Sequence, residues 1–125
     1  MTLFYLTNQN KVGFFAKESF DTNSGWKIDP CCFLFNLNQK QKYGKLKSDN
    51  INDMDKSFYC ANNCGPSANC LGCNLNTNLK HIYHSMETDY INKVFNNGSM
   101  ILPSKKGKEN EYEVIETEIF QIIIY

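Results

Sequence analysis

The sequence predicts a mainly β fold, an antiparallel two-sheet β-sandwich with at most one or two short helices; an α+β fold stays open. Short apolar runs with the composition of strands recur along the chain, and clusters of turn residues separate them. Most of the elements that can be recognised are strands. With 125 residues, of which 42% are hydrophobic, the chain forms at most one domain and can bury a core.

The first half of the chain contains the clearest strands. Residues 2–7 (TLFYLT) and 12–16 (VGFFA) flank a polar turn and predict a hairpin, and residues 21–25 (DTNSG) predict a loop. Residues 31–37 (CCFLFNL) carry apolar side chains on both faces, which is typical of a strand that is covered on both sides. Residues 42–47 (KYGKLK) predict an edge strand, because charged side chains discourage further pairing at an edge.

The second half alternates less regularly. Residues 57–61 (SFYCA) predict a short strand and residues 62–67 (NNCGPS) a turn. Between residues 82 and 95 the apolar positions fit a helical period, but a long loop with a few anchoring aromatic residues fits equally well. The final segment, 112–125 (YEVIETEIFQIIIY), predicts a long strand with a bulge, because its apolar residues change face along the segment.

Charge and apolar patterning narrow the class of partner. The net charge is zero and all thirteen basic residues are lysines, so we expect no nucleic acid as partner. No apolar run approaches the roughly 18 residues of a spanning helix, so we expect no membrane insertion. Nor does the N-terminus resemble a signal peptide, which favours a cytoplasmic protein with reduced thiols. The abundant asparagine is interpreted as a bias in codon usage.

Four cysteines lie within one short window, which raises the question of a zinc site. They are Cys60, Cys64, Cys70 and Cys73. Thiolates at short spacings are good zinc ligands, and His81 or His84 could replace one of them. However, only five residues separate the two cysteine pairs, whereas zinc frameworks usually place a dozen or more there. Cysteine is also often simply buried. We therefore expect no metal and no other cofactor, and keep zinc as the alternative.

The sequence contains no recognisable catalytic constellation, and we expect no enzymatic activity. Ser67 lies in GPSAN, which differs from the strained turn of a serine hydrolase. Glu116 and Glu118 are two residues apart on a predicted strand and so share a face, where two carboxylates can perform acid–base chemistry. A solvated pair of surface carboxylates explains the same pattern.

Several stretches, taken in order, resemble the TLDc domain family. They are KVGFFAKESFDTNSGWKIDPCCFLFNL, FYCANNCGPS, VFNNGSMILP and YEVIETEIFQI. The resemblance spans residues 2–122, so residues 1–125 are interpreted as a single, partial TLDc-like domain. The matching positions, to which the resemblance assigns a structural role, are Gly13, Phe15, Asp29, Pro30, Phe33, Phe35, Gly65, Pro66, Ser67, Glu116, Glu118 and Phe120.

The chain also departs from the family pattern. Gly13-Phe14-Phe15-Ala16 stands where the family usually has Gly-Gly-aromatic-Thr, and Cys70 and Cys73 replace family glycine or acidic positions. The largely helical N-terminal portion of the family has no counterpart here. A sandwich without that portion leaves apolar surface to cover, so we expect a protein partner or a larger assembly.

For function, the resemblance implies a non-catalytic binding or regulatory module. Such modules are linked to protection against oxidative damage or to regulation of the vacuolar-type proton pump. A structural subunit of a larger assembly is the first alternative. A small zinc-binding protein that uses the four-cysteine window is the second.

Overall fold

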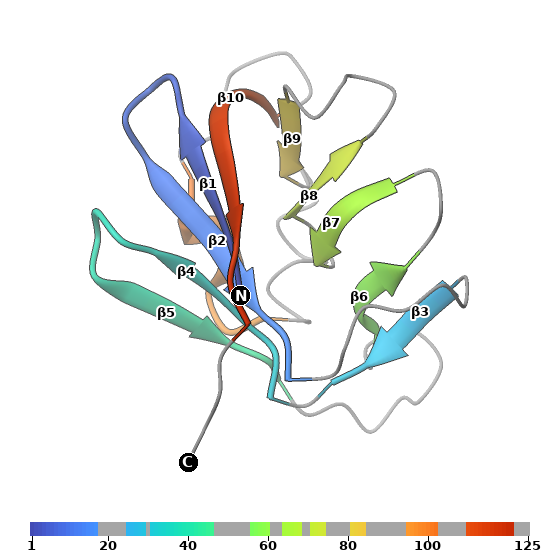
Figure 1. Ribbon diagram of the computed structural model, residues 1–125. Coiled ribbons are helices and arrows are strands. Elements are labelled where there is room, and N and C mark those ends of the chain that lie inside the picture. Colours follow the sequence, from blue (N-terminus) through green and yellow to red (C-terminus); the bar gives the residue numbers. More distant parts are fainter. Residues whose placement is uncertain are drawn as a thin grey trace.

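The computed structural model describes residues 1–17, 25–29, 31–46, 56–60, 64–68, 71–74, 81–84, 95–102 and 110–121 (Figure 1). These residues form ten strands and one 3-10 turn, η2 (Gly98–Met100), which confirms the mainly β class. The strands are β1 (Thr2–Leu6), β2 (Lys11–Phe15), β3 (Gly25–Ile28), β4 (Phe33–Asn36), β5 (Gln41–Gly44), β6 (Lys56–Cys60), β7 (Cys64–Ala68), β8 (Leu71–Asn74), β9 (His81–His84) and β10 (Asn110–Ile119).

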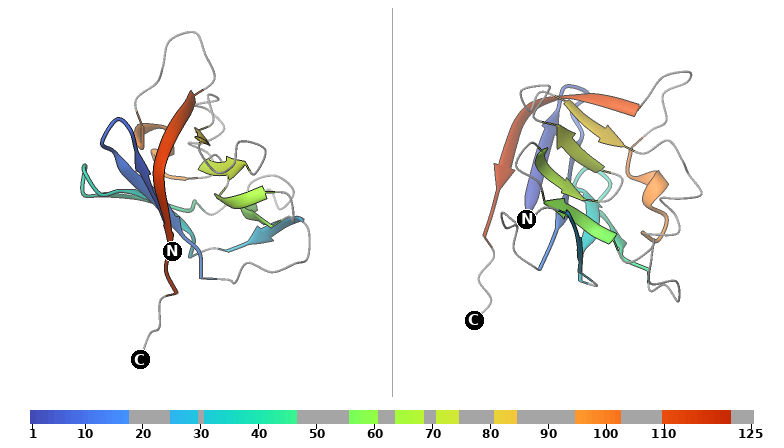
Figure 2. Two further views of the ribbon diagram at one scale, coloured as in Figure 1. Left: turned by 45° about the horizontal axis from the view of Figure 1, so that its top comes forward. Right: turned by 90° about the vertical axis from the view of Figure 1, so that its right-hand side faces the viewer.

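All ten strands belong to one continuous sheet, with the order β3-β6-β7-β8-β9-β10-β1-β2-β4-β5. Every neighbouring pair is antiparallel. Figures 1 and 2 show β10 running between two groups of strands, with β1, β2, β4 and β5 on one side and the other five strands on the other. The division into two separate sheets of a sandwich stays a prediction.

The predicted hairpin at the start of the chain is β1–β2. Its turn is closed by the backbone, because the Leu6 N–H donates to the Asn10 carbonyl (2.9 Å) and the Gln9 N–H donates to the Leu6 carbonyl (3.0 Å). Gln9 has a φ of 71°, which asparagine and glycine adopt more readily than glutamine. A second hairpin joins β4 to β5, and β5 is the last strand in the sheet order, as predicted for an edge.

The predicted bulge in the final strand is also present. Tyr5 of β1 lies opposite Glu116, whereas Leu6 lies opposite Val114, so Ile115 is the extra residue of β10. The side chain of Ile115 is 71% exposed. A bulge of one residue reverses which side chains share a face, so Val114 lies opposite Leu6 before the bulge and Thr117 lies opposite Phe4 after it. Ile119 is 68% exposed.

The core is one cluster to which both sides of β10 contribute. Phe4, Phe14 and Leu34 are fully buried on the strands β1, β2 and β4. Leu71 of β8 and Ile82 of β9 belong to the same cluster. Its other buried members are Leu6, Val12, Cys32, Tyr43, Phe95, Ile101, Leu102 and Tyr112. Within the apolar segment 31–37, Cys32 is buried in this core, whereas its neighbour Cys31 is exposed.

The opposite face of β2 and β4 is covered by aromatic side chains of these same strands. Phe35 lies over Gly13, because a Cβ atom at Gly13 would stand 2.8 Å from the Phe35 ring. Phe15 stacks on Phe33 with 5.1 Å between ring centroids, and Phe33 meets Phe35 edge-on at 6.3 Å. Four of the residues that carry the TLDc resemblance thus form this aromatic face.

Three predictions for individual segments need correction or extension. The turn predicted at residues 62–67 is wrong for residues 64–67, which belong to strand β7. A helix and a loop that begin at residue 82 are both wrong for residues 82–84, which are part of strand β9. Strands β3 and β8 were not predicted. Residues 85–94, Pro30 and Cys70 lie outside the described residues.

Candidate binding groove

Asp29, one of the residues that carry the resemblance, has a buried carboxylate that organises the connection between β3 and β4. Its Oδ2 accepts a hydrogen bond from the Lys17 N–H (2.6 Å) and its Oδ1 accepts one from the Cys31 N–H (2.9 Å). The Asp29 backbone carbonyl also accepts the Cys32 N–H (3.1 Å). Burial, with the negative charge of Asp29 as the second cause, raises the pKa of the Cys32 thiol to about 12. The thiol of Cys32 therefore stays protonated at neutral pH, and we assign Asp29 a structural role.

The two candidate glutamates of β10, Glu116 and Glu118, lie beside β1. Glu116 is opposite Tyr5 and Glu118 is opposite Leu3. The Tyr5 hydroxyl donates to Glu118 Oε2 (3.3 Å), and Glu116 is exposed. The carboxylate of Glu118 thus has a phenol as partner, and the arrangement matches a solvated pair.

The four-cysteine window spans three neighbouring strands. Cys60 ends β6, Cys64 begins β7 and Cys73 lies in β8. Cys64 is opposite Asn74, the residue after Cys73, so the backbones of β7 and β8 bring these two cysteines close in register. Within the part of the chain that the structure describes, no group of three or more potential ligands is placed to hold a metal ion. Since Cys70 is outside that part, the zinc alternative stays untested.

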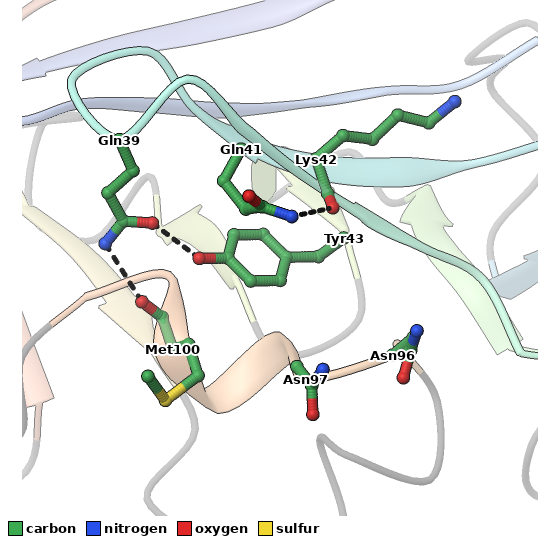
Figure 3. Close-up of a pocket in the computed structure, with 7 residues that line it drawn as sticks. All are labelled: Gln39, Gln41, Lys42, Tyr43, Asn96, Asn97 and Met100. Atoms are coloured by element: carbon green, nitrogen blue, oxygen red, sulfur yellow. Dashed lines mark hydrogen bonds between the residues drawn. The ribbon is translucent and has the colours of Figure 1, made fainter.

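A groove lies between the outer edge of β5 and the segment 95–102 that passes beside it (Figure 3). Its volume is about 500 Å³. Two short runs of the chain form its walls, and the sequence separates them by more than fifty residues. The residues that line it are Gln39, Gln41, Lys42, Tyr43, Asn96, Asn97 and Met100.

The segment 95–102, which forms the far wall of the groove, is fixed to the β4–β5 hairpin by side-chain amides. The buried Asn36 donates from Nδ2 to the Ile101 carbonyl (2.8 Å), and its Oδ1 accepts the Gln39 N–H (3.0 Å). Gln39 in turn donates from Nε2 to the Met100 carbonyl (3.1 Å), and the Tyr43 hydroxyl donates to Gln39 Oε1. Because a buried polar group without a partner is costly, the buried amide of Asn36 holds the two walls together, and the exposed Gln39 adds a second hydrogen bond between them.

The shape of the far wall depends on one turn. Asn97 precedes η2 with φ 58° and ψ 27°, a left-handed conformation that asparagine tolerates better than most residues. This conformation turns the chain away from β5 after Asn96, and the space between them is the groove. The Asn97-Gly98 pair is typical of a turn, but nothing in the sequence indicates that β5 lies across the groove from it.

Chemically, the groove is a recognition surface. Its lining offers side-chain amides, which donate and accept hydrogen bonds without changing protonation. Burial raises the pKa of Tyr43, so its hydroxyl stays a donor. Lys42 has the only charged side chain among the lining residues. Its ammonium does not point into the groove, because Nζ lies 4.3 Å from the centroid of the Phe33 ring. That position is on the opposite face of β5 from Tyr43, since neighbouring side chains of a strand alternate. The groove thus suits a neutral polar ligand.

None of the candidate residues from the sequence lines this groove. Its residues are glutamines, asparagines, one lysine, one tyrosine and one methionine, types that occur throughout the chain without a local signature. The sequence offers two signals here, the edge strand predicted for residues 42–47 and the Asn97-Gly98 pair, which is typical of a turn. Neither indicates that the two segments meet.

Comparison with family models, with curated proteins and with solved structures gives no match to this chain. The TLDc resemblance therefore stays a prediction. Among the described residues, no helix has the length and apolar character needed to cross a membrane.

Proposed function

We propose that this chain is a non-catalytic binding and regulatory module of the cytoplasm, as its resemblance to TLDc domains implies. Its activity is to hold a protein partner. In the resembled family, such binding is linked to protection against oxidative damage or to regulation of the vacuolar-type proton pump. These two roles are the ones we would test first for this chain.

The groove beside β5 is the observation that carries this proposal. Its walls are held by hydrogen bonds from Asn36 and Gln39, so the groove exists before a ligand arrives and little ordering entropy is lost on binding. Its lining is rich in amides and directs no charge inward. This composition favours hydrogen bonding to a neutral polar ligand, such as a polypeptide backbone, over proton transfer.

Photo-crosslinking tests whether the groove meets a partner. A benzoylphenylalanine is introduced in place of Met100, which lines the groove and is 65% exposed, and the chain is irradiated in an extract of cells that express it. A matched chain carries the same residue in place of Ile115, which is 71% exposed and outside the groove. We expect adducts of discrete mass from position 100 that position 115 does not give. Equal labelling from both positions, or none from either, would contradict the proposal.

A structural subunit of a larger assembly is the second candidate, and one observation favours it. Ile115 and Ile119 of β10, and Phe120 directly after this strand, are all substantially exposed. Apolar side chains gathered on one strand suit burial against another subunit. In that case position 115, rather than position 100, would give the discrete adduct, and native mass spectrometry would show a complex of fixed stoichiometry.

A further inference from the structure

The outer edge of β5 is only partly used by the chain itself. Lys45 and Phe95 form an isolated antiparallel bridge, and the Asn96 N–H donates to the Gly44 carbonyl (2.8 Å). At Asn97 the chain turns away from the edge. Pairing along this edge therefore begins at Lys45, reaches Gly44 and stops there.

The next backbone groups on this edge belong to Lys42. In a strand the N–H and C=O of one residue point to one side, and those of the next residue point to the other side. Because the Gly44 carbonyl points outward to Asn96, the backbone groups of Lys42 also point outward, whereas those of Tyr43 point to β4. Among the described residues we find only a long contact to them, from Gln41 Nε2 to the Lys42 carbonyl (3.4 Å). A flexible glutamine side chain can leave that position for a better donor.

Charge distinguishes between the occupants that this edge could accept. Lys40 and Lys42 are exposed, and Lys45 follows on the same strand segment. Pairing with β5 of a second copy would bring these lysines close to their own counterparts, which is destabilising. An incoming strand with carboxylates would instead be attracted.

We propose that an extended acidic segment of a partner protein adds as a further strand to the outer edge of β5, an inference that rests on the function proposed above. Its backbone pairs with the N–H and C=O of Lys42 and continues the pairing that Asn96 begins. Its neutral side chains lie on the groove side with Tyr43. Its aspartates or glutamates lie on the side of Lys42, where they meet the lysine ammonium. Such strand addition takes affinity from the main chain and specificity from alternate side chains.

The probe for this proposal is a fluorescent nine-residue peptide in which glutamate alternates with valine and threonine. Two control peptides accompany it: one carries N-methyl groups on alternate amides, and one has lysine in place of each glutamate. We expect saturable binding of the first peptide by fluorescence anisotropy and no measurable binding of either control. Equal affinity of the N-methylated peptide would overturn strand addition, and equal affinity of the lysine peptide would overturn the charge argument.

Two variants of Lys42 distinguish the contribution of its backbone hydrogen bond to peptide binding from the contribution of its charge. Lys42→Pro removes the outward N–H, and proline is tolerated at an edge where that group is not needed. We expect roughly tenfold or greater weakening of peptide binding from the lost hydrogen bond. Lys42→Thr keeps the N–H and is expected to weaken binding by only about two- to fivefold. Lys11→Thr, which changes an exposed lysine away from this edge, serves as the control with unchanged affinity.

Hydrogen exchange measured by NMR gives a readout at single residues. The Lys42 amide should exchange quickly in the free chain and slow by at least about tenfold with peptide, while the Tyr43 amide is slow in both states. Unchanged exchange at Lys42 with peptide bound elsewhere would refute the proposed site. Dimerisation that Lys42→Pro abolishes would identify a second copy as the occupant and would also refute it.

The outcomes also separate this inference from the proposed function. Suppose that a partner crosslinks at position 100 and that Lys42→Pro does not reduce this crosslinking. The groove then binds by another mode, so strand addition is refuted and the proposed binding function stands. Absence of both crosslinking and peptide binding means that both fail. If Lys42→Pro does not fold, the N-methylated peptide still decides the question.

Discussion

Replacing Gly13 with alanine is the sharpest test of the packing between β1 and β2. A Cβ atom at this position would stand 2.0 Å from the backbone oxygen of Thr2 and 2.8 Å from the Phe35 ring. Since a carbon–oxygen contact is normally about 3.3 Å, the two strands must separate locally by more than about 1 Å. Overpacking costs about 1–3 kcal/mol, and weakening one hydrogen bond of the hairpin adds about 1 kcal/mol. We expect Gly13→Ala to lower the free energy of unfolding by about 3 kcal/mol.

Urea denaturation followed by circular dichroism measures this change, and thermal melts should show a fall of about 10 °C in midpoint. Gly44→Ala is the matched control, because a Cβ there would have nothing within 4 Å. We expect it to be neutral or to stabilise the chain by up to about 1 kcal/mol. Truncation of Phe35 should not rescue Gly13→Ala, since the contact with the Thr2 backbone remains. A Gly13→Ala chain with the stability of Gly44→Ala would refute the reasoning.

Four further predictions concern the loop before β4, the thiols and the stability of the chain. The carboxylate of Asp29 accepts hydrogen bonds from two backbone N–H groups, and in Asp29→Asn the amide NH2 faces one of these donors. Urea unfolding should therefore show the free energy of unfolding lowered by about 1.5–3 kcal/mol, and an unchanged midpoint would contradict the structural role of Asp29. The pKa of Cys32 rises on folding from 9.0 to about 12, so the unfolded chain releases this proton first and stability should fall as the pH rises between these values. Cys32→Ala should remove this contribution to the dependence of the free energy of unfolding on pH, whereas Cys31→Ala should keep it. The same pH dependence in both variants would contradict the prediction. Elemental analysis should find no stoichiometric zinc in the purified chain, whereas zinc that is lost in Cys70→Ser would establish the alternative. Finally, the melting temperature should rise with protein concentration, because association covers apolar surface; a strict monomer with a concentration-independent melt near or above about 60 °C would argue against the need for a partner.

The parts of the fold that were predicted correctly are those where apolar periodicity is strong. β1, β2 and β4 follow from their aromatic and aliphatic residues, and β5 follows from the lysines that suit an edge. The bulge at Ile115 follows from the change of apolar face along β10. These signals are local, so a single sequence contains them.

The strands that were missed have compositions that argue against strands. β7 (CGPSA) contains a Gly-Pro pair, which indicates a turn when it is read alone, and β8 (LGCN) contains a glycine and an asparagine. Tertiary pairing with β6 and β9 outweighs these weak local preferences. In β9 the apolar spacing fits a helix and a strand equally well over so few residues.

The groove could not be predicted, because it depends on contacts between distant residues. Asn36 and Ile101 are hydrogen-bonded across 65 positions, and no local pattern announces that contact. The abundance of asparagine was interpreted as codon bias, and yet Asn36 is buried with specific partners and Asn97 sets the turn of the far wall. Composition does not reveal which members of a common residue type carry a structural role.

The pairing of β1 with β10 also has a consequence for how the chain folds. Thr2 lies opposite Ile119 and Leu6 opposite Val114, so the central ladder of the sheet joins residues more than a hundred positions apart. Such non-local contacts slow folding, because the entropy of closing a long loop is lost before the contact is gained. During synthesis β1 emerges before β10. Until β10 has been synthesised, one edge of β1 is unpaired and Phe4 and Leu6 are uncovered on that side. We therefore expect slow folding, on the scale of milliseconds to seconds, and a nascent chain that exposes apolar surface until β10 is available.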